Sequence, residues 1–339
     1  MKIQSVIAGS AFEEPTEYYS SDTLELMLSP LYERLKLPKG RLEELTGIIR
    51  RGCYSADLSP GEIASLSVKK LLKNLDLKSH HIDALIYSGV CRDALEPSTS
   101  SQVHHRLQCK SACLHFDISN ACLGMMSGIH LATKLLADPK IHRVVVTTGE
   151  NSQPMLNRLI KELNSNLDIN RKNVKPHIAS LTLGSASLSL LIAKESDYPG
   201  APKILDFDWK TDTSAYNLCQ ALGDYWNPRM HTDSEHLLVA GVKLGKSLWK
   251  EWDVGKKEAL TFYLTHQVGK AHEAILRSEL NLSPYKSYRT YPDFGNTGSA
   301  AVALTWHLAK ENNIFPSGSR GVWLGIGSGL NAMLMEMEH

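Results

Sequence analysis

Residues 113–130 read CLHFDISNACLGMMSGIH, a pattern typical of a strand that passes through a tight turn into a helix. Residues 114–118 are mostly apolar and of strand length, Ser119 and Asn120 favour a turn, and small and apolar residues follow at helical spacing. Cys122 lies where the turn becomes the helix. A helix N-terminus carries partial positive charge and free backbone N–H groups, so a thiol there should be easier to ionise. Cys122 is therefore a candidate nucleophile, although a single cysteine is also often a small core residue.

The composition is ordinary for a soluble globular protein. The 339 residues are 42% hydrophobic and 22% charged, with a formal net charge of +1, so no electrostatic argument favours nucleic acid or an anionic membrane as partner. No apolar run is long enough to span a bilayer, and residues 1–9 look like a first buried strand rather than a signal peptide. The six cysteines form no disulfide framework. We expect a cytoplasmic protein.

Strands and helices alternate along the chain, which predicts a layered α/β fold. Before and after the opening stretch, residues 82–90 and 143–148 have the length and apolar character of buried strands. The turn-rich segment 197–202 is the best candidate boundary, dividing the chain into halves of residues 1–198 and 199–339. The order of elements is similar in the two halves, which suggests an internal duplication.

Further expected elements are helices near residues 21–36, 59–72 and 234–252, strands at 181–193, 203–209 and 259–264, and a partly helical surface excursion at 151–178.

Three stretches of the second half place polar residues at strand ends or tight turns, where α/β folds tend to present reactive groups. His266 ends an apolar strand, Asn296 follows a glycine and leads into a helix, and Ser328 lies in the glycine-rich bend GIGSGLN of residues 325–331. Each has a purely structural alternative: a satisfied strand-end histidine, an asparagine that supplies turn geometry, and glycines that permit close packing.

Taken together, Cys122, His266 and Asn296 resemble the Cys-His-Asn constellation of the thiolase superfamily, and the similarity to its ketoacyl synthase III branch covers essentially the whole chain. Within that branch the chain is most similar to the OleA enzymes, which join two fatty acyl-CoA molecules head to head, and to related α-pyrone synthases. The matching segments are residues 95–99, 117–122, 182–184, 266–268, 295–296 and 325–331. The resemblance implies a duplicated, five-layered αβαβα thiolase-like fold.

The resemblance also implies a role for each residue. Cys122 would take the first acyl group from a thioester, while the backbone N–H groups of Cys122 and Ser328 hold the oxyanion. His266 and Asn296 would hydrogen-bond the carbonyl of the second thioester and stabilise its enolate. The substrates would be acyl-CoA or acyl-carrier-protein thioesters, with no metal and no organic cofactor.

Glu96 distinguishes between two kinds of condensation. A carboxylate there would repel the malonyl carboxylate that decarboxylative synthases use. A Claisen condensation without decarboxylation instead needs a base to remove an α-proton, and a positioned glutamate can serve. In OleA enzymes the matching glutamate enters the active site from the other subunit, so the resemblance implies a homodimer. The structural alternative is a solvated loop carboxylate.

Several functions stay open at this point. Within the family the alternatives are an α-pyrone synthase that joins two β-ketoacyl thioesters and a decarboxylative 3-oxoacyl-ACP synthase III that uses malonyl-ACP. Outside it they are a Cys-His-Asn hydrolase or acyltransferase and a non-catalytic thiolase-fold subunit.

Histidines and cysteines also gather between residues 104 and 115, namely His104, His105, Cys109, Cys113 and His115. Their spacing fits no common zinc pattern. We therefore expect no metal there.

Overall fold

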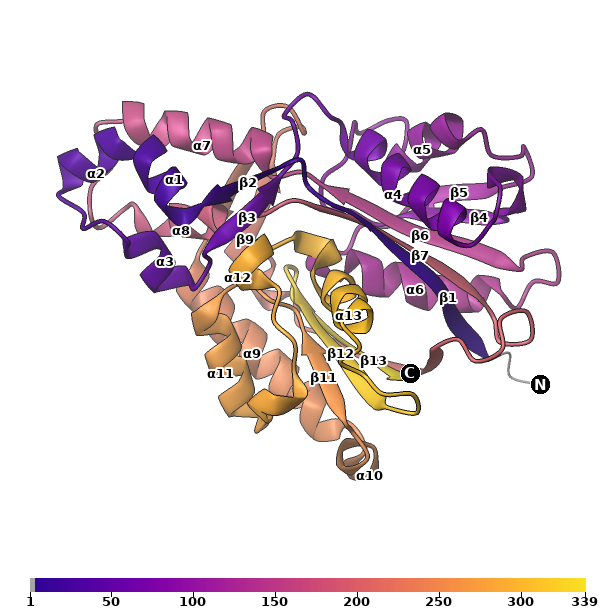
Figure 1. Cartoon of the computed structure of the whole chain (residues 1–339). Helices are drawn as coiled ribbons and strands as arrows, with labels where there is room; N and C mark the ends of the chain where they lie inside the picture. The colour runs from indigo at the N-terminus through magenta and orange to yellow at the C-terminus, as the bar shows by residue number, and fades with distance from the viewer. Residues whose placement is uncertain (1–3) are drawn as a thin grey trace.

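Strands buried on both faces form the centre of the molecule. In β6 (Arg143–Glu150) every residue after Arg143 is buried, and a strand of this kind needs cover on both sides. The computed structural model, which describes residues 4–339, supplies this cover with helices on each side of a nine-stranded mixed sheet (Figure 1).

The sheet has the strand order β11-β12-β13-β8-β1-β7-β6-β4-β5. One set of strands comes from the first half of the chain and the other from the second, and the two sets join where β1 pairs with β8, with Ser5 opposite Ile204. The remaining strands are β1 (Ser5–Glu13), β4 (Ala84–Tyr87), β5 (Leu114–Asp117), β7 (Ala186–Lys194), β8 (Lys203–Thr211), β11 (Phe262–Thr265), β12 (Arg320–Gly327) and β13 (Asn331–Glu338).

Helices and strands stack in five layers: a central layer of helices, a layer of strands from each half of the chain on either side of it, and an outer layer of helices over each set of strands. The central layer is α6 (Gly124–Leu135) and α13 (Ala301–Glu311), whose apolar residues share one core with strands of both halves. One outer layer, α4 (Pro60–Asn74) and α5 (Thr99–Leu107), covers the strands of the first half. The other, α9 (Ser234–Glu251) and α11 (Lys270–Leu280), covers those of the second. The predicted α/β fold with αβαβα layering is confirmed (Figure 1).

Several expected elements have different limits. The helix expected over residues 21–36 is two helices, α1 (Ser21–Met27) and α2 (Ser29–Leu35), because Pro30 begins a new helical turn. The strand expected over residues 181–193 begins only at Ala186, after the short helix α8 (Lys175–Leu181).

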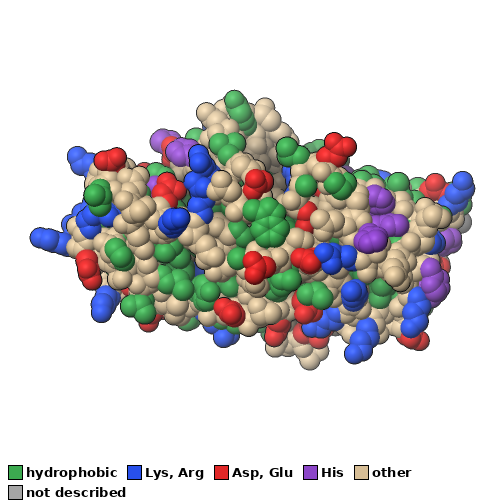
Figure 2. Space-filling model, turned by 90° about the horizontal axis from the view of Figure 1, so that it is seen from above, with side chains coloured by type: hydrophobic (Ala, Val, Ile, Leu, Met, Phe, Trp, Pro, Cys, Tyr) green, Lys and Arg blue, Asp and Glu red, His purple; other side chains and the backbone are tan. Residues whose placement is uncertain are grey.

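The remaining elements lie around this framework: β2 (Glu17–Ser20) paired with β3 (Arg50–Cys53), β9 (Cys219–Leu222) paired with β10 (Arg229–Thr232), α3 (Arg41–Thr46), α7 (Gln153–Ser165), α10 (Val254–Glu258) and α12 (Tyr291–Phe294). No helix within residues 4–339 is long and apolar enough to cross a membrane. Acidic and basic side chains are interspersed over the face in Figure 2, in keeping with the small net charge.

Candidate active site

Cys122 lies in a tight turn between β5 and α6. The turn is a short 3₁₀ helix, Ala121–Leu123, and α6 begins only at Gly124. Ala121 has a φ of 45°, in the left-handed region, so the backbone reverses sharply just before the thiol. A Cβ on Gly124 would lie 2.0 Å from the carbonyl oxygen of Ser88, so a glycine is required for the turn to pack against the end of β4. The predicted strand, turn and helix are present.

The surroundings of Cys122 keep its thiol protonated. Burial raises the pKa of Cys122 to about 12, and the neighbouring Cys219 and Glu150 add to this by disfavouring a nearby negative charge. The backbone N–H of Cys122 stabilises the thiolate, but by less. The prediction that this thiol ionises more easily is therefore wrong for the protein without substrate, because desolvation outweighs the favourable helix N-terminus.

Glu150 ties the segments around Cys122 together. It ends β6, is buried, and accepts hydrogen bonds from the backbone N–H groups of Val90 (2.8 Å), Cys91 (3.1 Å) and Ser299 (3.3 Å). Val90 and Cys91 follow β4, while Ser299 belongs to the short 3₁₀ helix Gly298–Ala300 of the second half. One carboxylate thus fixes loops from both halves of the chain.

His266 directly follows β11 and is buried. Its backbone N–H donates a hydrogen bond of 2.8 Å to the carbonyl oxygen of Leu324 in β12, which holds the residue beside that strand. Burial lowers the pKa of the imidazole to about 3, and the nearby His272 lowers it further, while Asn296 lies close enough to oppose the shift. Neither ring nitrogen makes a hydrogen bond within residues 4–339. The ring is neutral at physiological pH and offers one N–H donor and one acceptor.

Asn296 is held from both sides by the first half of the chain. The backbone N–H of Asn296 donates to the carbonyl oxygen of Thr182 (2.8 Å), and the carbonyl oxygen of Asn296 accepts a hydrogen bond from the backbone N–H of Gly184 (2.9 Å). A Cβ on Gly184 would lie only 1.8 Å from the carbonyl oxygen of Phe294. These contacts give a physical reason for the Thr-Leu-Gly segment at residues 182–184.

The three predicted residues come from elements that meet where the two halves join. The turn Ala121–Leu123 packs against Gly298–Ala300, which begins two residues after Asn296, and against β12, to which His266 is hydrogen-bonded. Ser328 directly follows β12. Asn331, the last residue of the GIGSGLN segment, donates a side-chain hydrogen bond of 3.1 Å to Asn120, two residues before Cys122.

A hollow of about 320 Å³ lies next to this turn. Asn120 and Leu123, which flank Cys122, line it together with residues of α6, β8 and β13, whereas Cys122, His266 and Asn296 do not. The hollow therefore lies beside the meeting point of these three residues, not at it.

Glu96 lies on the surface, away from the place where the segments of Cys122, His266 and Asn296 of the same chain meet. It lies in the loop between β4 and α5, where Glu96 and Leu95 are both exposed and Leu95 is fully so. The ends of the loop are fixed, because the backbone N–H of Asp93 donates to Thr99 (3.1 Å) and Arg92 donates to Ser119 (2.6 Å). Between these anchors the carboxylate of Glu96 projects from the surface of the chain.

Two neighbours of Cys122, Glu150 and Cys219, are not among the residues predicted from the sequence. Glu150 could have been noticed, because a carboxylate that ends an apolar strand is unusual unless it is paired. Cys219, in β9, has no signal in the sequence that connects it to residue 122.

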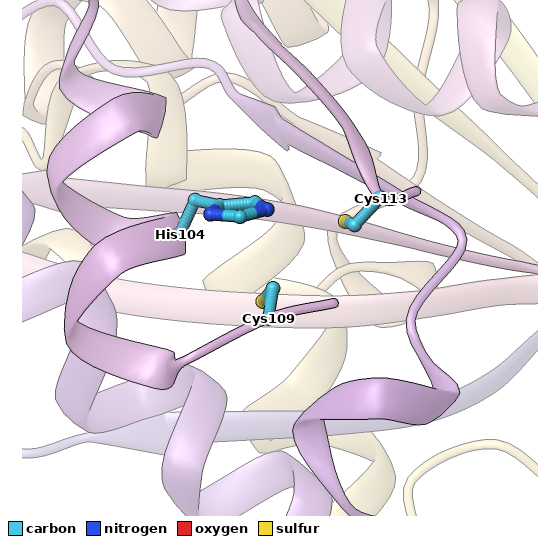
Figure 3. A group of neighbouring side chains, drawn as sticks. All are labelled: His104, Cys109 and Cys113. Atoms are coloured by element: carbon cyan, nitrogen blue, oxygen red, sulfur yellow. The ribbon is translucent and has the colours of Figure 1, made fainter. Parts of the chain in front are cut away.

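The structure also gathers part of the histidine and cysteine group. One ligand atom each of His104, Cys109 and Cys113 lies within 4.8 Å of the others (Figure 3). His105 is exposed on the same helix, and the ring of His115 lies 4.9 Å from that of His104.

Comparison with known proteins agrees with this architecture. Residues 254–337 match the family described as 3-Oxoacyl-[acyl-carrier-protein (ACP)] synthase III C terminal. Over 99% of both chains, the sequence is 30% identical to the acyl-CoA:acyl-CoA alkyltransferase of Xanthomonas campestris, and it is 29% identical to that of Shewanella oneidensis over the full length of both. The chain belongs to the acyl-CoA:acyl-CoA alkyltransferase (OleA) family.

Solved structures of this family superpose on the whole chain. The crystal structure of a glutamate-to-alanine variant of Xanthomonas campestris OleA has a TM-score of 0.94 at 28% sequence identity and covers 100% of this chain and 99% of its own. More distant is the β-ketoacyl-[acyl-carrier-protein] synthase III of Listeria monocytogenes, 24% identical over 84% of this chain. As a member of the OleA family, the protein is an acyl-transferring, condensing enzyme of the thiolase superfamily.

Proposed function

We propose that the enzyme joins two fatty acyl-CoA molecules into a β-ketoacyl product without decarboxylation, through an acyl group on Cys122. The observation that carries this proposal is the meeting of the Cys122 turn with the segments of His266 and Asn296, in a chain that matches acyl-CoA:acyl-CoA alkyltransferases over almost its whole length. A cysteine-to-serine variant of Xanthomonas campestris OleA has been crystallised with lauric acid and lauroyl-CoA, which supports acyl-CoA as substrate.

In the first step the sulfur of Cys122 attacks the thioester carbonyl of one acyl-CoA. The carbon–sulfur bond to CoA breaks, and the proton of the Cys122 thiol leaves with the CoA thiol, so charge balances. Because the pKa of this thiol is about 12, the proton stays on sulfur until a substrate is bound. The backbone N–H groups of Cys122 and Ser328 would stabilise the oxyanion, and such a donor is typically worth about 100- to 1,000-fold in rate.

In the second step the carbonyl oxygen of another acyl-CoA accepts hydrogen bonds from His266 and Asn296. A neutral imidazole donates one N–H, which matches a carbonyl that turns into an enolate. Glu96 removes the α-proton, the α-carbon attacks the acyl carbonyl on Cys122, and the bond from that carbonyl to sulfur breaks. The product is a β-ketoacyl-CoA, and the protons balance when Glu96 returns its proton to the Cys122 thiolate through solvent. The reaction uses no metal or organic cofactor.

Glu96 would act in the active site of a second copy of the chain. Its exposure, next to the fully exposed Leu95, fits a loop that is covered by a partner rather than by its own chain. A homodimer would then be required for condensation but not for acylation of Cys122. The six unpaired cysteines fit a reducing compartment, and we place the enzyme in the cytoplasm.

A decarboxylative synthase that uses malonyl-ACP is the second candidate, favoured by the match of residues 254–337 to the synthase III family. The carboxylate of Glu96 argues against it if this side chain enters the site, because it would repel a malonyl carboxylate. An α-pyrone synthase, acting on two β-ketoacyl thioesters, would use the same residues.

The experiment that tests the proposal supplies the purified enzyme with myristoyl-CoA, with and without malonyl-CoA, and identifies the products by mass spectrometry. We expect a β-keto product that contains two myristoyl chains in both reactions. A product that forms only with malonyl-CoA supports the decarboxylative synthase, and free myristic acid without any carbon–carbon coupling supports a hydrolase. A third reaction supplies a β-ketoacyl-CoA, and a pyrone formed there, with no product from myristoyl-CoA alone, identifies the α-pyrone synthase.

A further inference from the structure

One imidazole and two thiols gather at the C-terminal end of α5, away from the Glu96 loop. His104 belongs to the last turn of the helix, Cys109 follows it, and Cys113 immediately precedes β5. Figure 3 shows the three side chains pointing into a common space from these segments. Their ligand atoms lie within 4.8 Å of one another, with Cys113 buried and the other two half-buried.

We propose that His104, Cys109 and Cys113 bind a zinc ion that fastens the end of α5 to the start of β5. Thiolate and imidazole are the ligands that Zn²⁺ prefers in proteins. The spacing of these residues led to the opposite expectation, and the proposal departs from it because of their arrangement in space. The linear spacing matches no common zinc pattern, but helix α5 turns His104 toward two cysteines of the following loop.

The distances need only a small change to fit this ion. A tetrahedral zinc ion holds nitrogen and sulfur ligands roughly 3.5 Å apart, so these atoms would approach by about 1 Å. The present contact of His104 is weak: its Nε2 lies 3.3 Å from the carbonyl oxygen of Lys110 and can exchange that contact for a metal bond. His115, whose ring centroid lies 4.9 Å from that of His104, is a candidate for a fourth position, and water is the alternative.

The position of the site suggests a structural role. At its other end, α5 is already fixed to β5, because the backbone N–H groups of Thr99 and Ser100 both donate 2.8 Å hydrogen bonds to the carboxylate of Asp117. A metal at His104, Cys109 and Cys113 would fasten the opposite end. The helix that follows the Glu96 loop and the strand that leads to Cys122 would then form one rigid unit.

Metal binding to the full-length protein tests this proposal directly. The protein is purified without chelator, its zinc content is measured, and the metal-depleted protein is titrated with Zn²⁺ and with Co²⁺. We expect about one zinc per chain, a rise in melting temperature on adding Zn²⁺, and a near-ultraviolet thiolate-to-cobalt absorption band. The variants His104→Ala, Cys109→Ser and Cys113→Ser each remove a ligand and should weaken Zn²⁺ binding by more than the roughly 10- to 100-fold that loss of a ligand's outer-shell partner costs.

Two matched variants serve as controls. His105→Ala removes the adjacent, exposed histidine of the same helix, and Cys53→Ala removes a cysteine elsewhere in the chain; both should bind Zn²⁺ like the original protein. Circular dichroism checks that each variant folds. The proposal is overturned if the folded protein binds neither ion, if the controls weaken binding as much as the ligand variants do, or if peptide mapping without reductant finds a disulfide between Cys109 and Cys113.

Discussion

The backbone N–H of Gly184 donates a hydrogen bond of 2.9 Å to the carbonyl oxygen of Asn296. This contact joins the two halves of the chain at a proposed active-site residue. It depends on glycine, because a Cβ at residue 184 would lie 1.8 Å from the carbonyl oxygen of Phe294.

We therefore expect Gly184→Ala to push the segment of Asn296 away from its position. Overpacking of this kind should lower the free energy of unfolding by about 2 kcal/mol, and condensation should slow because the enolate loses a donor. The measurements are urea denaturation and the product assay. Gly255→Ala in α10 is the control: this helical position should change stability by no more than about 1 kcal/mol. Equal effects of the two substitutions would contradict the argument.

The high pKa of Cys122 predicts how the thiol reacts with iodoacetamide. Because the thiolate fraction of a group with a pKa of about 12 rises throughout the accessible range, the alkylation rate should increase about tenfold per pH unit from pH 7 to pH 10. An ordinary cysteine levels off above about pH 9.5. Mass spectrometry of the peptide that contains Cys122 measures the rate, and a plateau below pH 9 would show that the thiol is not shielded as described.

Buried neutral histidines predict a loss of stability in acid. Burial lowers the pKa of His307 to about 4, so between pH 6.5 and pH 4 this residue binds a proton in the unfolded chain but not in the folded one. Stability should therefore fall as the pH drops through that window and be constant above it. The loss from this residue between pH 7.5 and pH 5 is about 2 kcal/mol.

His307→Asn should remove that share of the loss. The free energy of unfolding of the variant and of the original protein is measured at pH 7.5 and at pH 5. The carboxylates change the stability of both proteins equally, so their contribution cancels in the difference. If the difference between the two proteins is independent of pH, His307 has the same pKa in the folded and the unfolded chain.

Because Glu96 is exposed, we predict that two variants inactive in condensation, Glu96→Ala and Cys122→Ala, regain activity when they are mixed. Glu96→Ala should still acquire an acyl group on Cys122 but form no β-keto product, and Cys122→Ala should do neither. A mixed dimer holds one site with both residues if Glu96 acts in the partner's site. An equal mixture should then recover about a quarter of the original activity, since half the dimers are mixed and one of their two sites is intact.

No recovery in the mixture would place Glu96 in the site of its own chain, provided that native mass spectrometry detects mixed dimers. Normal condensation by Glu96→Ala alone would end its assignment as the base. Glu96→Gln keeps the shape of the side chain and separates loss of the carboxylate from loss of packing.

The sequence predicted the layered architecture well because buried strands and the helices between them leave strong periodic patterns. It also located the Cys122 turn, since the strand, the turn residues and the small helical residues agree with one another. It could not give the electrostatics of that turn. The pKa of Cys122 depends first on its burial and then on Cys219 and Glu150, which are distant in sequence and come close only after folding.

Local patterns failed where pairing partners are remote. Residues 50–53 carry no strand pattern of their own, yet they form β3 because β2 pairs with them. In the same way, the linear spacing of His104, Cys109 and Cys113 did not reveal that a helical turn and a loop bring their side chains together.

The pairing of β1 with β8 has a consequence for how the molecule could be divided. A cut in the connection between Lys194 and Lys203 would leave Cys122 on one fragment and the imidazole and carboxamide on the other. Neither fragment would hold a complete set of reacting groups. The chain is thus a natural candidate for a split enzyme, in which recovered turnover reports the reassembly of two separately produced pieces.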